Sequence, residues 1–342
     1  MMRVVFCCDA GPVRGIGHVM RCLALAEELA GRGAECLFVA DLADVPWAAT
    51  QVTSRSFGIH QHGDATVKLA ETIIELDPSA VVFDSYYAPA EVSLALRTAG
   101  IPLLTIIDGE SRGQTGDVYV DANLGSERLP DPTDAPRLAG LPYALLRTEV
   151  VRLRPDAPPS GARYDPPRVL AYFGGTDAFG ASPVLATALA ASGATFAATF
   201  VAPRGELRDA LAAVPLGAGQ SLTAIGPTDE LMTLAADADL VVSASGTSLW
   251  ELLCIGAAAA VVWVVDNQRL GYERVLAAGT AAGLGHLDDV RADPSGAAAT
   301  LGDLLRDVAR RDRLRATGWS LVDGRGRARV ADALMGIAGL PA

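Results

Sequence analysis

Short apolar runs typical of buried strands alternate in this chain with longer stretches of helical spacing, and no other feature limits the fold as much. Strands that alternate with helices form right-handed crossovers and a mostly parallel sheet covered on both faces. The first half therefore predicts an α/β domain. Its expected strands are 3–8, 36–40, 80–83 and 103–107, and its expected helices are 18–30, 67–76 and 89–99.

The alternation stops at residues 152–167, which are rich in proline and glycine and poor in apolar residues, and then restarts. This predicts two doubly wound domains with a cleft between them. The first is 1–151, 152–167 is a linker, the second is 168–320, and 321–342 form a C-terminal helix that can pack back on the first domain. Expected elements of the second half are strands 169–173, 195–201, 240–243 and 258–264, and helices 183–191, 230–235, 247–255 and 269–278.

Composition and charge exclude several classes of protein. Of 342 residues half are apolar, which excludes a disordered chain, and 40 acidic against 28 basic residues argue against nucleic-acid binding. The uncharged apolar stretch 252–265 is shorter than the roughly 20 residues of a membrane span, so it predicts a helix end plus a core strand. With no signal peptide recognised, a cytoplasmic protein without membrane insertion is expected, and its oligomeric state stays open.

The cysteines and histidines predict neither a metal site nor a disulfide framework. Five cysteines form no CxxC pair, which fits reduced and mostly buried thiols. His60, His62 and His286 have no Cys or Glu partner at ligand spacing. No cofactor is predicted.

A glycine-rich loop from Asp9 to His18 follows the first expected strand. Ligands of open parallel sheets bind beyond the carboxyl ends of the strands. Gly15 and Gly17 allow a tight turn, and His18 falls in the first helical turn, where the helix dipole favours a neutral imidazole that can act as a base. The alternative is a plain turn with His18 capping the helix. A dinucleotide-binding loop fits less well, because Met20 stands in place of the third glycine.

A second polar loop, Ser243-Ala-Ser-Gly-Thr-Ser-Leu-Trp-Glu251, again leads from a strand into a helix. Its hydroxyls and free N–H groups at the helix start suit a pyrophosphate without a lysine, and a carboxylate one turn later can hold two ribose hydroxyls. The alternative is a capped helix with a solvated salt bridge. The residues predicted to bind a nucleotide here are Ser245, Gly246, Thr247, Ser248 and Glu251.

Two further strand ends carry small polar residues, Phe173-Gly-Gly-Thr-Asp177 and Val264-Val-Asp-Asn-Gln268. Either loop alone is compatible with a plain turn. Three such loops at one sheet edge favour a phosphate or nucleotide site. Gly174 and Gly175 are predicted to bind the nucleotide, and Asn267 and Gln268 the substrate.

Polar residues at strand ends of the first half complete the candidates. Asp84 and Tyr86 follow the third expected strand and Asp108 the fourth, where each can contact a sugar or simply cap a strand end. The arginines within 325–329 are expected on a solvated helix face, and Asp237 and Asp239 in a capping turn. The residues predicted to bind substrate in the first half are Asp9, Gly17, Tyr86 and Asp108.

Several of these segments together resemble one family, the nucleotide-sugar hydrolases of pseudaminic acid biosynthesis. The resemblance is collinear over nearly the whole chain. It implies the GT-B fold of two Rossmann-like domains and hydrolysis of UDP-2,4-diacetamido-2,4,6-trideoxy-β-L-altropyranose to free sugar and UDP. The segments are Gly-Ile-Gly-His-Val-Met-Arg-Cys-Leu-Ala-Leu-Ala (15–26), Asp84-Ser-Tyr86, Asp121-Ala-Asn-Leu-Gly125, Leu141-Pro-Tyr-Ala-Leu-Leu-Arg147, Phe173-Gly-Gly-Thr-Asp177, Trp250-Glu-Leu252, Asp266-Asn-Gln268 and Val322-Asp-Gly-Arg-Gly326.

The resemblance implies roles for individual residues. His18 takes the place of the catalytic histidine, Tyr86 of the cleft tyrosine and Glu251 of the ribose-binding glutamate. Asn267 and Gln268 take the place of a pair near the diphosphate and sugar, and the turn 246–248 that of the phosphate-binding helix start. The chain departs from the family mostly on the sugar side, with Cys7 for Arg, Ser85 for His, Gly109 for Asp, Ala178 for Pro and Ser245 for Gly.

These residues predict a hydrolase of a UDP-activated amino or deoxy sugar. Neutral His18 activates a water that attacks the anomeric carbon with inversion, and UDP leaves from the second domain. Two alternatives stay open. One is an inverting glycosyltransferase that uses the same base on an acceptor, and the other is a non-catalytic nucleotide-sugar binding protein.

Overall fold

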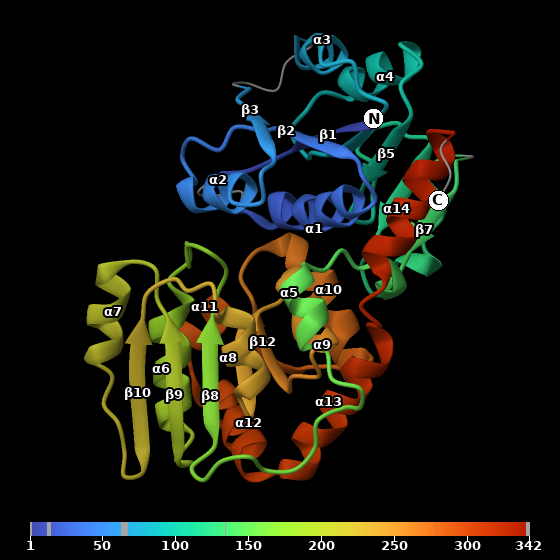
Figure 1. Cartoon of the computed structure of the whole chain (residues 1–342). Coiled ribbons are helices and arrows are strands. Elements are labelled where there is room, and N and C mark those ends of the chain that lie inside the picture. The colour runs from blue at the N-terminus through green and yellow to red at the C-terminus, as the bar shows by residue number, and fades with distance from the viewer. Residues whose placement is uncertain (1, 12–14, 63–67, 134, 340–342) are drawn as a thin grey trace. The chain divides into compact units, whose positions relative to one another are not determined.

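The computed structural model of the chain describes residues 2–11, 15–62, 68–133 and 135–339. It divides into two compact units, which we describe one at a time (Figure 1). The first unit comprises residues 1–148 and 324–342, and the second comprises 149–323. The chain thus leaves the first unit once and returns to it with helix α14 (Gly326–Ile337). None of the helices described combines the length and apolar character needed to cross a lipid bilayer.

The first unit is built on a sheet whose described strands run in the order β3-β2-β1-β4-β5-β6-β7, all pairs parallel. From β1 the chain proceeds to one side through β2 and β3, and then to the other side from β4 onward. The order therefore reverses between β1 and β4, which is where doubly wound sheets bind ligands. The strands are β1 (Arg3–Cys8), β2 (Glu35–Val39), β3 (Gly58–His60), β4 (Ala80–Asp84), β5 (Leu103–Ile106), β6 (Val118–Asp121) and β7 (Arg137–Ala139).

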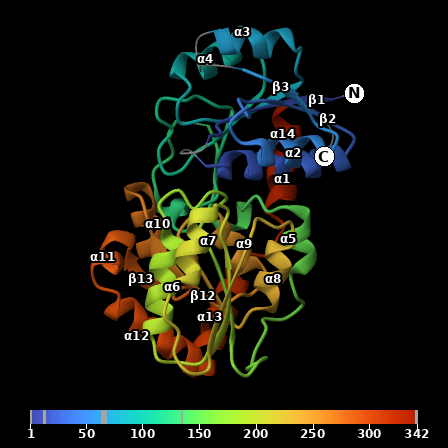
Figure 2. The same ribbon diagram turned by 90° about the vertical axis from the view of Figure 1, so that its left-hand side faces the viewer.

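Helices cover both faces of this sheet, because alternate residues of each strand point to opposite sides. Val4 and Phe6 of β1 pack in the core under α1, α2 and α14, whereas Val5 packs in a separate core under α3 and α4. Figure 2 shows these two groups of helices on opposite sides of the strands. The helices are α1 (Gly17–Gly31), α2 (Pro46–Thr53), α3 (Lys68–Glu75) and α4 (Ala90–Thr98), with short 3₁₀ turns η1 (Ser126–Arg128) and η2 (Leu141–Tyr143).

The second unit has its own parallel sheet, in the order β10-β9-β8-β11-β12-β13 over the described strands. Helices α6, α7, α11 and α12 pack with the main core of this unit, α8 contacts β8 and α9, and α13 packs on α9. The strands are β8 (Arg168–Tyr172), β9 (Phe196–Val201), β10 (Gln220–Ile225), β11 (Leu240–Ala244), β12 (Ala259–Trp263) and β13 (Ala282–His286). The helices are α5 (Thr148–Leu153), α6 (Ala181–Ala191), α7 (Gly205–Ala212), α8 (Leu231–Asp237), α9 (Ser248–Cys254), α10 (Asp266–Ala277), α11 (Leu287–Ala292), α12 (Ser295–Arg306) and α13 (Val308–Leu321).

The predicted α/β class with two parallel sheets is confirmed. The apolar stretch 252–265 ends α9 and continues into β12, as expected. All five cysteines are buried and unpaired. The elements that the sequence did not predict are mostly short or polar. Strands β3 and β7 have three residues each. Strand β10 and helix α13 contain many polar residues and therefore show no clear apolar pattern.

The segment 152–167, expected as a linker, has no helix or strand after Leu153. Hydrogen bonds fix it to the second unit. Arg154 donates to the carbonyl of Cys254 at 2.9 Å, and the carboxylate of Asp239 accepts from the backbone N–H groups of Arg163 and Arg168 at 3.1 Å. The aspartate expected in a capping turn therefore holds this segment.

The expectation of a solvated face for the arginines of 325–329 is wrong for two of them. Arg327 pairs with Glu28 at 3.3 Å and donates to the hydroxyl of Thr148 at 2.6 Å, and Arg329 donates to the carbonyl of Pro142 at 2.8 Å. Helix α14 buries its apolar side against the rest of the first unit. The arginines beside that apolar side therefore lie close to partners in the same unit.

Candidate functional site

Polar side chains gather at the carboxyl edge of the first sheet, beside the reversal between β1 and β4. Asp9 follows β1, Asp84 ends β4, and Asp108 follows β5. Because β1, β4 and β5 are parallel neighbours, these three residues lie at one edge. Helix α1 starts at the same edge and carries His18 in its first turn.

His18 is held by a buried carboxylate. Its Nδ1 lies 2.7 Å from Oδ1 of Asp84, which is fully buried, whereas the His18 side chain keeps 12% of its surface exposed. A carboxylate only accepts, so the bond requires the proton on Nδ1 and, in the neutral ring, leaves the lone pair on Nε2. A carboxylate that orients an imidazole in this way is how a histidine base is arranged in hydrolytic triads.

Arg21, one helical turn after His18, joins two carboxylates. Its Nε and Nη2 each lie 2.6 Å from one oxygen of Asp84, and its Nη1 and Nη2 reach Asp108 at 3.1 and 3.0 Å. Burial by itself disfavours all three charges. The opposite charges and hydrogen bonds nevertheless hold the pKa of Asp84 and of Asp108 below the ordinary value, and raise that of Arg21 well above it.

Tyr86 connects this cluster to the rest of the edge. Its hydroxyl donates to Asp108, and its ring meets that of His18 edge-on, with 4.6 Å between centroids. The guanidinium carbon of Arg112 lies 4.3 Å from the centre of the Tyr86 ring. Burial first, and then the charge of Asp108, raise the pKa of Tyr86 far above its usual value, so the phenol stays protonated.

Asp9 fixes the loop that carries Tyr86. Its buried carboxylate accepts from the hydroxyl of Ser85 at 2.8 Å and from the backbone N–H of Tyr86 at 2.6 Å. Both carboxylate oxygens are therefore engaged by this loop. Gly17, also predicted to bind substrate, is the first residue of α1. Residues 12–14 of the loop between Asp9 and Gly17 lie outside the described residues.

Two members of the cluster, Arg21 and Asn123, were not predicted to have a role. Arg21 was named only as part of the segment 15–26, which resembles the hydrolase family. It lies three residues after His18, so both residues are on one helix face. Asn123 likewise lay inside a quoted segment, and its amide donates to Asp108 at 2.6 Å and to Asp121 at 2.9 Å. An arginine on an otherwise apolar face was the available signal for a buried ion pair.

In the second unit, the three predicted loops follow neighbouring strands. Gly174 and Gly175 come after β8, Ser245 after β11, and Asn267 and Gln268 lie in the first turn of α10, after β12. Because β8 pairs with β11 and β11 with β12, all parallel, the loops share one sheet edge. The two glycines and Asn267 are exposed, and Gln268 is half-buried.

Two of these loops touch. The carbonyl oxygen of the Gln268 side chain accepts from the backbone N–H of Val264 at 3.0 Å. Its amide nitrogen lies 3.9 Å from the point where a side chain at Gly246 would begin. The backbone N–H groups of Ser245 and Gly246 donate to the carbonyls of Val262 and Ala244, at 2.8 and 2.9 Å.

Two of the helix starts at this edge, those of α6 and α9, differ. Asp177 accepts from the backbone N–H groups of Ala181 and Ser182 at 2.7 and 3.0 Å, so a carboxylate already covers the start of α6. At α9 the preceding Thr247 makes no such side-chain bond, and Ser248 is the first helical residue. Glu251 lies one turn further on and is half-buried. An anion is therefore better accommodated at α9 than at α6.

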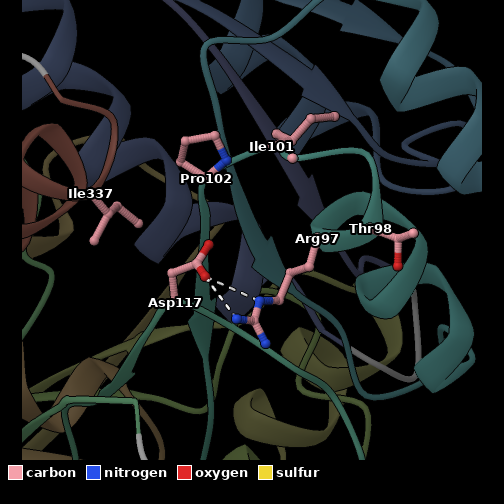
Figure 3. Close-up of a pocket in the computed structure, with 7 residues that line it drawn as sticks. Arg97, Thr98, Ile101, Pro102, Asp117 and Ile337 are labelled. Carbon is pink, nitrogen blue, oxygen red and sulfur yellow. Dashed lines mark hydrogen bonds and ion pairs between the residues drawn. The ribbon is translucent and has the colours of Figure 1, made fainter.

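Elsewhere the described residues offer little chemistry. No group of three or more of their His, Cys, Asp or Glu side chains is arranged to hold a metal ion. A hollow of about 570 Å³ lies at the opposite edge of the first sheet, around the start of β5 and the end of α14 (Figure 3). Its charged lining residues, Arg97 and Asp117, pair with each other at 3.0 Å. Nothing links it to the His18 cluster.

Solved structures share the fold of this chain. No protein-family model matches the sequence, and no curated protein matches it either. Among solved structures, Acinetobacter baumannii MurG superposes with a TM-score of 0.72 at 17% identity, covering 98% of this chain and 100% of that one. The calicheamicin glycosyltransferase CalG4 gives 0.65 at 17%, covering 99% and 98%. MnaA of S. aureus, in a co-structure with UDP, gives 0.66 at 12%, covering 100% and 98%.

The chain therefore has a GT-B-like fold, as the resemblance implied. At these identities the likeness establishes the fold and no specific family. The assignment to the hydrolases of pseudaminic acid biosynthesis stays a prediction. The predicted residues form two sets, one at the carboxyl edge of each sheet.

Proposed function

We propose that the protein is an enzyme that takes a nucleotide sugar as donor and transfers the sugar to an acceptor with inversion at the anomeric carbon. One observation carries this proposal. His18 is oriented by a buried carboxylate that Arg21 in turn holds ionised, and it keeps part of its ring exposed. That arrangement suits a general base. The glycosyltransferase activity named for CalG4, which shares the fold, supports transfer.

The nucleotide would bind to the second unit. The hydroxyls of the turn 245–248 and its backbone N–H groups at Thr247 and Ser248, with Gly174 and Gly175, would receive the diphosphate, and Glu251 the ribose. Asn267 and Gln268 would contact the diphosphate and sugar. The adjacency of the three loops supports this assignment, as does the start of α9, where Thr247 makes no side-chain capping bond. UDP as the nucleotide is supported by the bound UDP of the MnaA structure.

The step would proceed as a direct displacement. Nε2 of His18 takes the proton of an acceptor hydroxyl or amine, whose electron pair attacks the anomeric carbon. The bond from that carbon to the diphosphate oxygen breaks, and its electron pair leaves with UDP. Hydrogen-bond donors around the diphosphate would stabilise the developing charge. General-base help of this kind is worth roughly 10²–10⁴-fold in rate.

Hydrolysis is the second candidate, with water as the acceptor. The segments that resemble the pseudaminic acid hydrolases favour it, since they include both His18 and the loop of Tyr86. The two reactions share the base and the leaving group, so the fold does not separate them.

The deciding experiment is a panel of nucleotide sugars in which release of the nucleoside diphosphate is followed with and without candidate acceptors. Release that requires an acceptor supports transfer, and release in buffer alone supports hydrolysis. In ¹⁸O-water, hydrolysis at the anomeric carbon labels the sugar, so label in UDP would contradict the mechanism. His18→Gln should abolish release that depends on the base. Release that is unchanged in this variant would refute the role of His18.

A further inference from the structure

Arg21 contributes to the site through its neighbours. Its guanidinium lies between Asp84 and Asp108 and makes two hydrogen bonds to each. Its Nη2 also lies 3.1 Å from Nδ1 of His18, close enough for the two groups to repel when both are charged. Only 11% of the Arg21 side chain is exposed, so water screens these interactions little.

The charge of Arg21 acts on His18 in two ways. Without Arg21, the negative charge of buried Asp84 would be balanced by a protonated imidazole, which has no lone pair for catalysis. The positive charge of Arg21 balances the carboxylate instead. Its own charge, next to the ring, also opposes protonation of the imidazole. Both effects favour the neutral, Nδ1-protonated form of His18.

We infer that Arg21 is a positioning residue, which keeps the His18 imidazole uncharged and its Nε2 available by neutralising Asp84. The inference deepens the proposed function and rests on it for its catalytic meaning. Asp108 acts in the opposite sense, because it shares the guanidinium with Asp84 and so weakens the compensation.

The charged and titratable groups facing His18 come from several elements of the first unit. Asp84 reaches the ring from β4 and Arg21 from α1. Tyr86 packs against the ring from the β4–α4 loop and stays protonated, and Asp108 lies behind Arg21 after β5. Asp9 holds the same loop through the backbone N–H of Tyr86. Of these groups, Arg21 and Asp108 can be changed without removing either partner of the His18–Asp84 bond.

The test is the titration of His18 by NMR of the full chain labelled with ¹⁵N at histidine. The sequence has four histidines, and His18→Gln identifies the signals of His18. In Arg21→Met the midpoint should rise by about 1 pH unit or more, since an adjacent cation is lost. In Asp108→Asn it should fall, and in Arg21→Lys it should stay near the native value. The native ring should show the tautomer protonated at Nδ1.

Arg21→Met takes the arginine away from the carboxylates of Asp84 and Asp108, and the variant can fail to fold. The double variant Arg21→Met/Asp108→Asn removes one charge of each sign, and its midpoint should also rise. Arg97→Met is the control, because this arginine pairs with Asp117 at the far edge of the sheet (Figure 3). An unchanged or lower midpoint in the double variant would overturn the inference.

Turnover supplies a second readout. The loss of kcat in Arg21→Met should shrink as the pH rises, because the ring then loses its proton in the variant too. Arg21→Lys should recover much of the activity at neutral pH. A loss that is equal at every pH would indicate a merely structural role and overturn the inference. If no nucleotide sugar is consumed by the native protein, the proposed function fails, while the titration still decides the role of Arg21.

Discussion

At the scale of single residues, the first unit is organised around Asp84. A carboxylate with no exposed surface is costly unless every charge and lone pair is met. Here His18 donates to one oxygen and Arg21 to both. The thiol of Cys22 adds a weak contact at 3.7 Å. The residue is therefore a structural anchor as well as the partner of the proposed base.

Replacing Asp84 by Asn tests its role in catalysis. The amide nitrogen or oxygen that faces His18 no longer fixes the proton on Nδ1, and the ring can bind with Nδ1 as acceptor. We expect kcat to fall by roughly 10²–10⁴-fold, the range of general-base help. Steady-state release of the nucleoside diphosphate measures it. Asp117→Asn, at the opposite edge of the same sheet, should leave kcat unchanged. A full-rate Asp84→Asn would contradict the assignment of His18 as base.

The same carboxylates predict how stability depends on pH. The pKa of Asp84 and of Asp108 is lower in the folded protein than usual, so the unfolded state binds protons first as the pH falls. Their contribution is complete above about pH 4 and is lost at lower pH. Urea unfolding from about pH 6 to about pH 3 should show this loss. Asp108→Asn should reduce it, and a slope as steep as that of the native protein would contradict the prediction.

How far the sequence predicts such residues follows from their positions. Asp9, Tyr86 and Asp108 were predicted because each follows a predicted strand, where ligands bind, and His18 because it lies in the first turn of the helix after the first strand. The pairing of Arg21 with carboxylates 63 and 87 residues away was not predicted. Helical spacing fixes the face on which a residue lies, but not which distant strand ends face it.

At the scale of elements, helix α14 depends on one glycine. A side chain at Gly326 would begin 2.2 Å from the carbonyl oxygen and 2.6 Å from the nitrogen of Ala144, both backbone atoms. Unlike a side chain, these backbone atoms cannot avoid the added methyl group by rotating. Gly326→Ala should therefore separate α14 from η2 and lower the free energy of unfolding by about 2 kcal/mol or more. Chemical denaturation with a probe in the first unit measures it.

Gly336 provides the control within the same helix. It is exposed, and a Cβ there has no heavy atom within 4 Å. Alanine is the better helix former, so Gly336→Ala should leave stability unchanged or raise it by up to about 1 kcal/mol. Equal destabilisation by both substitutions would mean that the contact with Ala144 is not what limits residue 326.

Helices and strands were predicted where the apolar residues that become buried have a strong periodic spacing in the sequence. The central strands β1 and β4 and the helix α1 were predicted from their apolar patterns. All three have such patterns because they are packed in the core. The edge strand β10 alternates between partly buried and exposed positions and was missed. Its parallel pairing with β9 comes from tertiary contacts that a local pattern does not contain.

At the scale of the whole molecule, the second unit is one continuous stretch of sequence, whereas the first unit is made of two. The core of the second unit is made entirely of residues within 149–323. The core of the first unit includes Val330, Ala331, Leu334 and Met335, which come after the second unit in the sequence. The sequence predicted the two sheets and a last helix that can pack back on the first domain, but not which residues of α1 that helix would contact.

This difference predicts the behaviour of fragments. Residues 149–323 alone should fold and unfold cooperatively, whereas 1–148 alone should not, because part of its core is absent. Joining 1–148 to 324–342 through a flexible Gly/Ser linker should restore folding of the first unit. Circular dichroism and thermal melting measure all three. A cooperative transition in 1–148 alone would show that α14 is dispensable.

The return of the chain to the first unit also sets an order of events during synthesis. On the ribosome, residues 149–323 can acquire their whole core before α14 emerges. The opening half of the protein, although made earlier, waits for α14 to leave the exit tunnel. The unit that holds His18 is thus completed only after the second unit has been synthesised.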